Sequence, residues 1–352
     1  MGTMDHRLIH WELAAKTAAT LGTPGPKLSP AEASAVVADL RRHADAAVGH
    51  VHEITRLEAA RDLRDSGVLI VDRASWARAN VHSFEAIIDR PLREAAAKHS
   101  ERLSATSAAV TARATGAEMG AILSFLSSKV LGQFDPFAPL KRPHLPEAGR
   151  LLLVAPNIVE VERELNVEPA DFRLWVCLHE QTHRVQFAAA PWLRDYLLGS
   201  IAELVEGMLG KADSLGERLT RLFTEKTPLT ELIRDEKDRE VMSRLTAVMS
   251  LLEGHANVVM DGVDSSIVPT VKTIRQRFAR RGADRGALEN WLRRILGLDA
   301  KMRQYADGQK FVSAVVQQIG MEGFNRVWER PEHLPTEHEL HHPQEWVDRM
   351  RA

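Results

Sequence analysis

Apolar residues recur every three or four positions along most of this chain, and this spacing is typical of helices that bury one face. The pattern predicts long helices over residues 9–21, 30–48, 72–98, 104–131 and 169–190, and another that begins near Arg239. Amphipathic helices with a basic side are expected over 265–281 and 287–296, and packing helices over 310–319 and 324–328. We therefore expect a mainly α fold.

The start of the second helix carries a clear capping signal. Ser29 is a suitable N-cap, Pro30 suits the first helical position, and Glu32 completes a capping box. Gly49 is the expected end of this helix, because glycine often ends helices. Phe125 is expected on the buried side of the Ala-rich fourth helix.

Two short apolar runs interrupt the helical pattern. Residues 68–71 follow Gly67 and predict either a buried strand or an entry turn. Residues 151–154 are followed closely by Pro156 and predict a short strand. The fold is therefore expected to contain one or two short strands among its helices.

Prolines at positions 136, 139, 143 and 146 mark the best candidate for a domain boundary. They divide the chain into a helical N-terminal half (1–133), a Pro-rich linker (134–149), a second half (150–330) and a polar, His-rich C-terminal tail (331–352). As an alternative, part of this stretch covers a functional site instead of linking two domains. With 352 residues, the chain is long enough for one large domain or two packed halves.

Charge, hydropathy and cysteine content exclude several classes of protein. The formal net charge is −2 with acidic and basic residues interspersed, so no basic face predicts nucleic-acid binding. The N-terminus lacks the apolar core of a signal peptide, and the longest apolar runs are too short for a membrane helix. The single cysteine, Cys177, excludes an internal disulfide and is expected to be a buried structural thiol. We expect a cytoplasmic protein that binds neither nucleic acid nor membrane, and the sequence does not predict its oligomeric state.

The chemistry of the chain is concentrated in the helix over 169–190, in the run His179-Glu180-Gln181-Thr182-His183 (HExxH). Two histidines at i and i+4 lie one turn apart, so both imidazoles can reach one metal ion. Zinc with three protein ligands keeps a fourth position for water and lowers the pKa of that water to about 7. Glu180, offset by about 100° around the helix, is then placed to act as a general base. The run predicts a zinc site with His179 and His183 as ligands; the alternative is a chance match on a buried helix.

A second run of the same pattern, His338-Glu339-Leu340-His341-His342, lies near the C-terminus. Pro335 precedes this run and Pro343 follows it directly, so His342 is expected to leave helical geometry. No apolar stripe frames the run. We therefore interpret it as a coincidental match in a solvated tail.

The third zinc ligand must come from elsewhere in the chain. An extension of the motif with Gly at 186 and His at 189 is ruled out, because these positions hold Gln186 and Ala189. Glu253 is the favoured ligand, because a carboxylate in so apolar a run needs a partner. The rival ligand is His255, which points about 200° away from Glu253 on the same helix. If Glu253 binds zinc, a bent turn at Gly254 could still bring His255 to the substrate oxyanion as a catalytic group.

These motifs resemble the Zincin-2 family, whose bacterial members are classed as hydrolases or zinc-dependent metalloproteases and are also labelled as associated with biosynthesis of the deazaflavin coenzyme. The residues that carry the resemblance are 178–183, Glu253-Gly254-His255 and Val259-Met260-Asp261, together with Asp72-Arg73, Trp76, Asn80, residues 130–135, Ala155-Pro156-Asn157, Tyr305, Gly308 and Phe311. The resemblance covers most of the chain and implies a mainly helical, zincin-like fold with a metal site and no settled substrate. The spacer over 184–252 is longer than in the familiar gluzincins, which leaves the third ligand open.

Three functions remain open on the sequence alone. The first is a zinc-dependent hydrolase, a metallopeptidase of gluzincin type that acts on a peptide or small amide, with His179, His183 and Glu253 on Zn²⁺ and Glu180 as the base. The second is a catalytically inactive binding or scaffold protein that a metal stabilises. The third is an amide hydrolase for a small metabolite, which rests on the family link alone. The strand over 151–154 either pairs with an extended substrate or is a buried connection.

Overall fold

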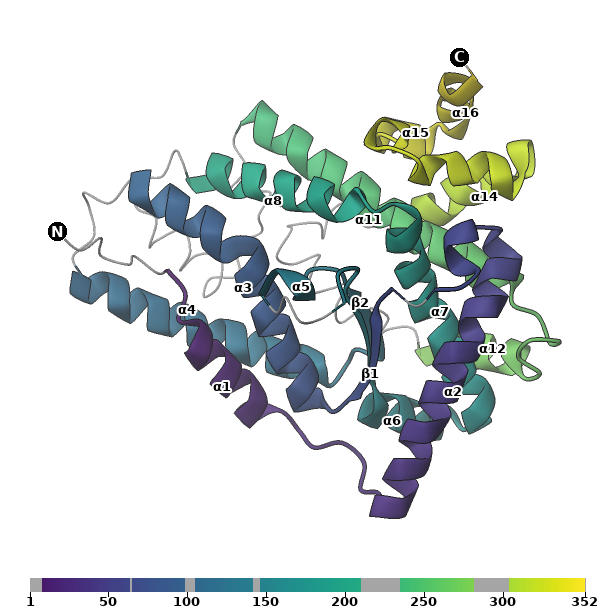
Figure 1. Cartoon of the computed structure of the whole chain (residues 1–352), viewed down its shortest axis with the longest axis horizontal. Helices are drawn as coiled ribbons and strands as arrows, with labels where there is room; N and C mark the ends of the chain where they lie inside the picture. Colours follow the sequence, from purple (N-terminus) through teal and green to yellow (C-terminus); the bar gives the residue numbers. More distant parts are fainter. Residues whose placement is uncertain are drawn as a thin grey trace.

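Helices form most of the part of the chain that the computed structural model describes, which is residues 8–63, 65–98, 105–141, 146–209, 235–281 and 304–351 (Figure 1). The longer helices are α1 (Trp11–Leu21), α2 (Pro30–Thr55), α3 (Arg73–Lys98), α4 (Ala105–Ser127), α6 (Ala155–Leu165), α7 (Pro169–Ala189), α8 (Leu193–Leu209), α11 (Glu236–Gly262), α12 (Val271–Arg281) and α14 (Gln304–Asn325). The shorter ones are α5 (Ala138–Lys141), α15 (Glu337–His341) and α16 (Pro343–Arg351). The mainly α fold is thereby confirmed. Among these described helices, none combines the length and the apolar character needed to span a bilayer.

A three-stranded sheet lies in the middle of the described structure, in the order β1-β3-β2 (Figure 1). β1 (Gly67–Val71) runs parallel to β3 (Arg150–Val154). β2 (Gly132–Asp135) runs antiparallel to β3, with Asp135 opposite Arg150. Every residue of β3 is buried. A central strand that is covered on both faces needs a continuous apolar sequence, which explains why this run shows no alternation.

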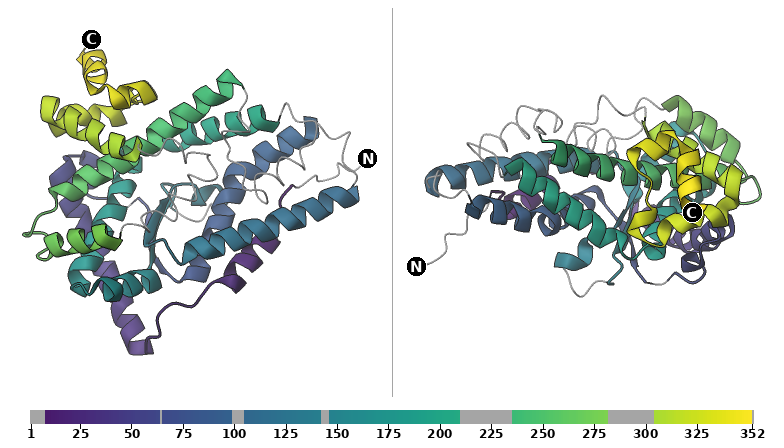
Figure 2. Two further views of the ribbon diagram at one scale, coloured as in Figure 1. Left: turned by 180° about the vertical axis from the view of Figure 1, so that it is seen from behind. Right: turned by 90° about the horizontal axis from the view of Figure 1, so that it is seen from above.

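The side chains of β3 alternate between two hydrophobic cores. Leu151 and Leu153 face the larger core, to which α2, α7, α11 and α14 contribute. Leu152 and Val154 face the smaller core, to which α1, α3 and α4 contribute. The two groups of helices lie on opposite sides of the sheet (Figures 1 and 2). The sheet is therefore the element that joins the two cores.

The sheet takes strands from both sides of the predicted linker. β1 comes from the predicted N-terminal half and β3 from the second half, and β2 extends into the predicted linker. Within the described residues, the stretch over 134–149 therefore contributes part of β2 and the short helix α5 to the fold. The division of the chain into two halves, a linker and a C-terminal segment stays a prediction.

The capping signal of α2 is confirmed, but its predicted end is wrong. Ser29 Oγ accepts from Glu32 N at 3.3 Å, and Ser29 N donates to Glu32 Oε2 at 2.7 Å. The helix continues past Gly49 to Thr55 and ends where Arg56 adopts a left-handed conformation, with φ 58°. The added turns bury residues of the helix's inner face, and this tertiary packing outweighs the tendency of one glycine to end the helix.

The predicted position of Phe125 on the buried side of α4 is also wrong, because this side chain is 63% exposed. α4 packs on α1 through Gly120, where a Cβ would lie 2.5 Å from Ala14 O. Phe125 is five residues further along and therefore lies about 140° around the helix from that contact. α4 ends at Ser127, earlier than predicted, and the Asn157 side chain donates to the Ser127 carbonyl at 2.7 Å.

The C-terminal segment is packed, not extended in solvent. α15 and α16 contact α14 and lie at the opposite end of the molecule from α1 and α4 (Figure 2). Trp346 is completely buried, and its indole N–H donates to His333 O at 2.8 Å. The prediction of a solvated tail is therefore wrong for this backbone, although the side chain of His338 is exposed. The predicted helix over 287–296 and the side chain of Tyr305 lie outside the described part of the chain.

Candidate metal centre

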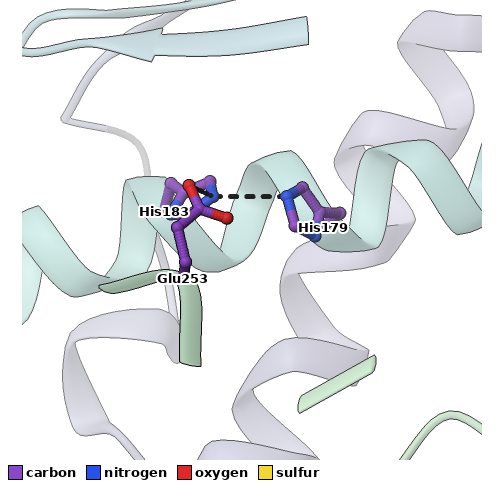
Figure 3. Close-up of side chains that lie close together, drawn as sticks. All are labelled: His179, His183 and Glu253. Atoms are coloured by element: carbon purple, nitrogen blue, oxygen red, sulfur yellow. Dashed lines mark hydrogen bonds and ion pairs between the residues drawn. The ribbon is translucent and has the colours of Figure 1, made fainter. Parts of the chain in front are cut away.

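The motif helix α7 begins as predicted and ends within one residue of the predicted position. Near its start, Asp171 Oδ2 accepts from the backbone N and the hydroxyl of Thr270, each at 2.7 Å. These bonds tie the start of α7 to the segment before α12. Phe172 is completely buried and lies on the same stripe of the helix as the motif histidines. His179 and His183 consequently project from one side of α7 (Figure 3).

The side chains of His179, His183 and Glu253 converge between α7 and α11 (Figure 3). The two histidine Nε2 atoms are 3.3 Å apart, and His183 Nε2 lies 3.6 Å from Glu253 Oε1. One ligand atom of each residue lies within 4.8 Å of the other two. Two nitrogens at about 2.0–2.1 Å from a tetrahedral zinc ion are separated by about 3.3 Å. The three donors therefore fit a zinc ion, and all three side chains are half-buried.

Gln186 determines which nitrogen of His183 carries the proton. Gln186 Nε2 donates to the Leu252 carbonyl at 2.8 Å, and because a carbonyl only accepts, this bond identifies the other end of the amide as the oxygen. Gln186 Oε1 lies 2.9 Å from His183 Nδ1 and accepts its proton. His183 Nε2 therefore keeps a free lone pair, as a metal ligand requires. Sequence reasoning missed this role, although a buried polar residue one turn after His183 is a usable signal.

The structure places His255 behind Gln186 and outside the metal cluster. His255 is completely buried, and its Nδ1 accepts from Gln186 Nε2 at 2.9 Å. Its ring stacks on Phe324, with 5.3 Å between centroids, and meets Trp328 edge-on. Burial, together with the nearby His183, lowers the pKa of His255 to about 3, so the ring is neutral. The helix α11 is continuous here, so no bent turn brings His255 forward.

Two glycines bring α14 against α11 beside Glu253. A Cβ on Gly254 would lie 2.2 Å from the carbonyl carbon of Gly308, and a Cβ on Gly308 would lie 2.0 Å from Ser250 O. Because no side chain fits at either position, the two helix backbones can pack directly against each other. Gly254 therefore allows α11 and α14 to cross at close distance. This contact fixes the position of the turn of α11 that carries Glu253.

Glu180 is buried beside the metal cluster and faces the start of β2. Its side chain lies so close to Gly132 that a Cβ there would be 2.5 Å from Glu180 Cγ. Burial raises the pKa of Glu180 to about 7, while the nearby His183 lowers it and the charge of Glu253 raises it. A carboxyl in such surroundings is suited to proton transfer. The structure thus brings Glu180 next to the predicted metal ligands.

Two further titratable groups of α7, His179 and Cys177, are uncharged. Burial and the neighbouring His183 lower the pKa of His179 to about 4, and Glu253 opposes this effect. A neutral imidazole is the form that binds a metal. Cys177 is completely buried on another side of α7, with Sγ 3.9 Å from Leu40 O, and burial raises the pKa of its thiol. The thiol is therefore structural and separate from the metal cluster.

Known proteins provide an independent comparison. A family model described as zincin-like metallopeptidase matches residues 9–347. No curated protein matches the chain. Among solved structures, a protein from Chloroflexus aurantiacus described as "a putative hydrolase with a novel fold" is 31% identical, with a TM-score of 0.70, and the match covers 97% of this chain and 99% of that chain. The match over nearly its whole length shows that this chain belongs to the zincin-like metallopeptidase family.

Proposed function

We propose that this protein is a zinc-dependent metallopeptidase of gluzincin type, with His179, His183 and Glu253 as zinc ligands and Glu180 as general base. The observation that carries the proposal is the convergence of two imidazole nitrogens and one carboxylate at zinc-ligand spacing, beside a buried carboxyl. Membership of the family and the similar solved protein support a metal-dependent hydrolase. Three protein ligands leave one position of a tetrahedral ion for water or substrate.

The residues of the chain have distinct roles in this proposal. A zinc ion would supply polarisation of the scissile carbonyl and activation of water. Glu180 would accept a proton from the attacking water and donate it to the leaving amine nitrogen. Gln186 would hold His183 in the tautomer that binds metal, and His255 would support Gln186 from the core without touching substrate.

The strand best placed for substrate is β2 and not the strand over 151–154 considered from the sequence. β3 has a neighbour on each side and is fully buried, so it is a connecting strand in the core. β2 lies at an edge of the described sheet, and its first residue, Gly132, contacts Glu180. We propose that an extended peptide lies along this edge, with the scissile bond next to Glu180.

The cellular compartment is a separate part of the proposal. Cys177 is the only cysteine of the sequence, and its thiol is free and buried. A protein of this size without disulfides fits a reducing compartment. We propose that the protein acts in the cytoplasm, which expression with a fractionation assay in its native cells would test.

The experiment that tests the proposed activity is hydrolysis of a mixed peptide library by the zinc-loaded full chain, measured by mass spectrometry. Glu180→Gln is expected to lower hydrolysis by about 10²–10⁴-fold, the usual contribution of a general base. The circular dichroism spectrum and zinc content should not change. Glu53→Gln, an exposed carboxylate on α2, is the matched control. Wild-type rates in Glu180→Gln would overturn the mechanism, and no cleavage by the zinc-loaded wild type would overturn the peptidase assignment.

A further inference from the structure

The second HExxH run folds differently from the first. His338 lies on α15, and His342 is its C-cap, where a φ of −127° takes it out of the helix, as Pro343 predicts. The two rings stack with 4.1 Å between centroids and 20° between planes. Glu345, in the first turn of α16, places Oε2 3.2 Å from His338 Nε2. One ligand atom of each of these three residues lies within 4.8 Å of the other two.

The backbone of α15 prepares His342 as a metal ligand. His342 Nδ1 lies 3.0 Å from the His338 carbonyl oxygen, which only accepts, so Nδ1 carries the proton. The Nε2 lone pair of His342 is therefore free. Gln186 imposes the same tautomer on His183 through a side chain. Two imidazoles and one carboxylate form a donor set that suits zinc and similar transition ions.

The glutamate inside this second run is not available for chemistry. Glu339 is buried, and its Oε1 accepts from Arg349 Nε at 2.7 Å. Its Oε2 accepts from Arg349 Nη2 at 3.0 Å and from Thr336 N at 2.8 Å. Burial opposes ionisation of this carboxyl, but the hydrogen bonds from Arg349 and Thr336 outweigh burial and hold the pKa of Glu339 below its usual value. A site here can bind an ion but lacks a general base.

Packed residues around the cluster anchor the two short helices beside its ligands. Trp346, the neighbour of Glu345, is completely buried and packs edge-on against Phe311, with 5.8 Å between centroids. Glu337, the first residue of α15, accepts a hydrogen bond from the Ser243 hydroxyl on α11. Because both short helices are anchored, binding an ion requires little further ordering of the chain.

We infer that His338, His342 and Glu345 form a second, exposed binding site for a divalent transition ion such as Zn²⁺, with water completing the coordination. The side chains of His338 and Glu345 are 64% and 57% exposed, so they can adjust to the ion. All three ligands lie in the short segment from α15 to the first turn of α16, and none comes from α7 or α11. The site therefore binds metal independently of the proposed catalytic centre.

The test is equilibrium dialysis of the full chain against increasing Zn²⁺, with bound zinc measured by elemental analysis. His342→Ala and Glu345→Gln each change one ligand on the surface. His341→Ala is the matched control, because this histidine belongs to the same run but faces Asp307 at 3.5 Å. Wild type and His341→Ala are expected to bind one more zinc ion than the two ligand variants, or to bind that ion at least about tenfold more tightly, since even an outer-shell change costs 10–100-fold in affinity. Excess Ca²⁺ should not displace it, because calcium prefers oxygen ligands.

Two results would overturn this inference. The first is equal zinc binding by wild type, His342→Ala and Glu345→Gln. The second is an equal loss in His341→Ala, which would show unspecific binding by a His-rich surface. Every protein in this series retains His179, His183 and Glu253. If zinc does not bind at α7, the amount of bound zinc would therefore be lower by the same amount in every protein of the series. This result differs from a failure of the second site, which would remove the difference between wild type and the two ligand variants.

Discussion

The two HExxH runs of this chain share a pattern but have different structures. In α7 both histidines lie within one continuous helix, and the third candidate ligand, Glu253, comes from the distant helix α11. In the second run the helix ends before His342, and Glu345 follows only three residues after that histidine. The first cluster is assembled by the packing of two long helices and is half-buried, whereas the second is local and exposed. The surroundings of a motif, and not the motif itself, determine its chemistry.

The glutamates of the two runs show this most clearly. Glu180 lies against Gly132 in a buried position that raises its pKa. Glu339 is also buried, but Arg349 and Thr336 hold its carboxylate in the ionised form. Only the first glutamate is therefore placed to exchange a proton at neutral pH. From this comparison we propose that the α7 cluster carries the reaction and that the C-terminal cluster binds an ion without catalysing a reaction.

The largest expected difference between the two runs is the effect on hydrolysis of removing the last histidine of each. His183→Ala should abolish peptide hydrolysis, because the ion at α7 loses one of three protein ligands. His342→Ala should leave hydrolysis unchanged, because its cluster contributes nothing to the reaction. Rates measured at saturating zinc separate the two. Hydrolysis that survives His183→Ala, or that disappears in His342→Ala, would contradict the assignment of the reaction to the first run.

A smaller effect is expected from the contact between Gly132 and Glu180. In Gly132→Ala the added Cβ would meet Glu180 Cγ at 2.5 Å and displace the carboxyl. Hydrolysis should fall by about 100-fold, the cost of a misplacement of about 1 Å, while zinc content stays constant. Gly49→Ala is the control, because nothing lies within 4 Å of its Cβ. This control should keep full activity and gain up to about 1 kcal/mol in free energy of unfolding; wild-type activity in Gly132→Ala would contradict the placement of Glu180.

The next effect tests how Gln186 fixes the tautomer of His183 in the first run. Gln186→Met removes the acceptor for His183 Nδ1, so zinc affinity at α7, measured by chelator competition, should fall by about 10–100-fold. The control is Gln181→Met. Gln181 lies on another face of α7, where its amide donates a hydrogen bond to Ala44 O of α2, and the substitution removes this bond. Both variants should lose stability by about 1–3 kcal/mol, but only Gln186→Met should lose zinc affinity. Equal affinities in the two variants would show that Gln186 has a structural role alone.

The smallest effect concerns pH and the second run. The pKa of Glu339 is lowered in the folded protein, so its ion pair stabilises the fold above the ordinary pKa of 4.5, and this stability is lost as the pH falls further. Glu339→Gln should therefore unfold in less urea than wild type at neutral pH, with a difference that shrinks as the solution becomes more acidic than pH 4.5. Hydrolysis should not change. A urea difference that is independent of pH would contradict the ion pair with Arg349.

The sequence was sufficient to predict those features of the structure that depend on the spacing of neighbouring residues. Histidines at i and i+4 share a helix face at any position, and a capping box at Ser29 is made of neighbouring residues. Glu253 could be singled out because a charged group in an apolar run needs a partner; the structure places it beside His183, and its role as a ligand stays a prediction. All of these predictions depend on residues within one or two turns of a helix.

The sequence was insufficient to predict those features of the site that depend on packing between distant segments of the chain. The role of Gln186 depends on the Leu252 carbonyl, and the room for Glu180 depends on Gly132 in a strand that the Pro-rich pattern concealed. Helix geometry alone predicts that His255 points about 200° away from Glu253, but only the packing of α14 on α11 shows that Phe324 covers the ring in the core. No periodicity along one helix reports which helix will pack against it.

The most direct test of the central claim is the zinc content of the α7 centre, measured by elemental analysis after dialysis in a His342→Ala background that removes the C-terminal site. This background is expected to hold one zinc ion per chain. Adding Glu253→Gln should remove that ion, whereas adding Glu240→Gln, an exposed carboxylate on the same helix, should not. Retention of zinc with Glu253→Gln would contradict the account, because the third ligand would then come from another residue.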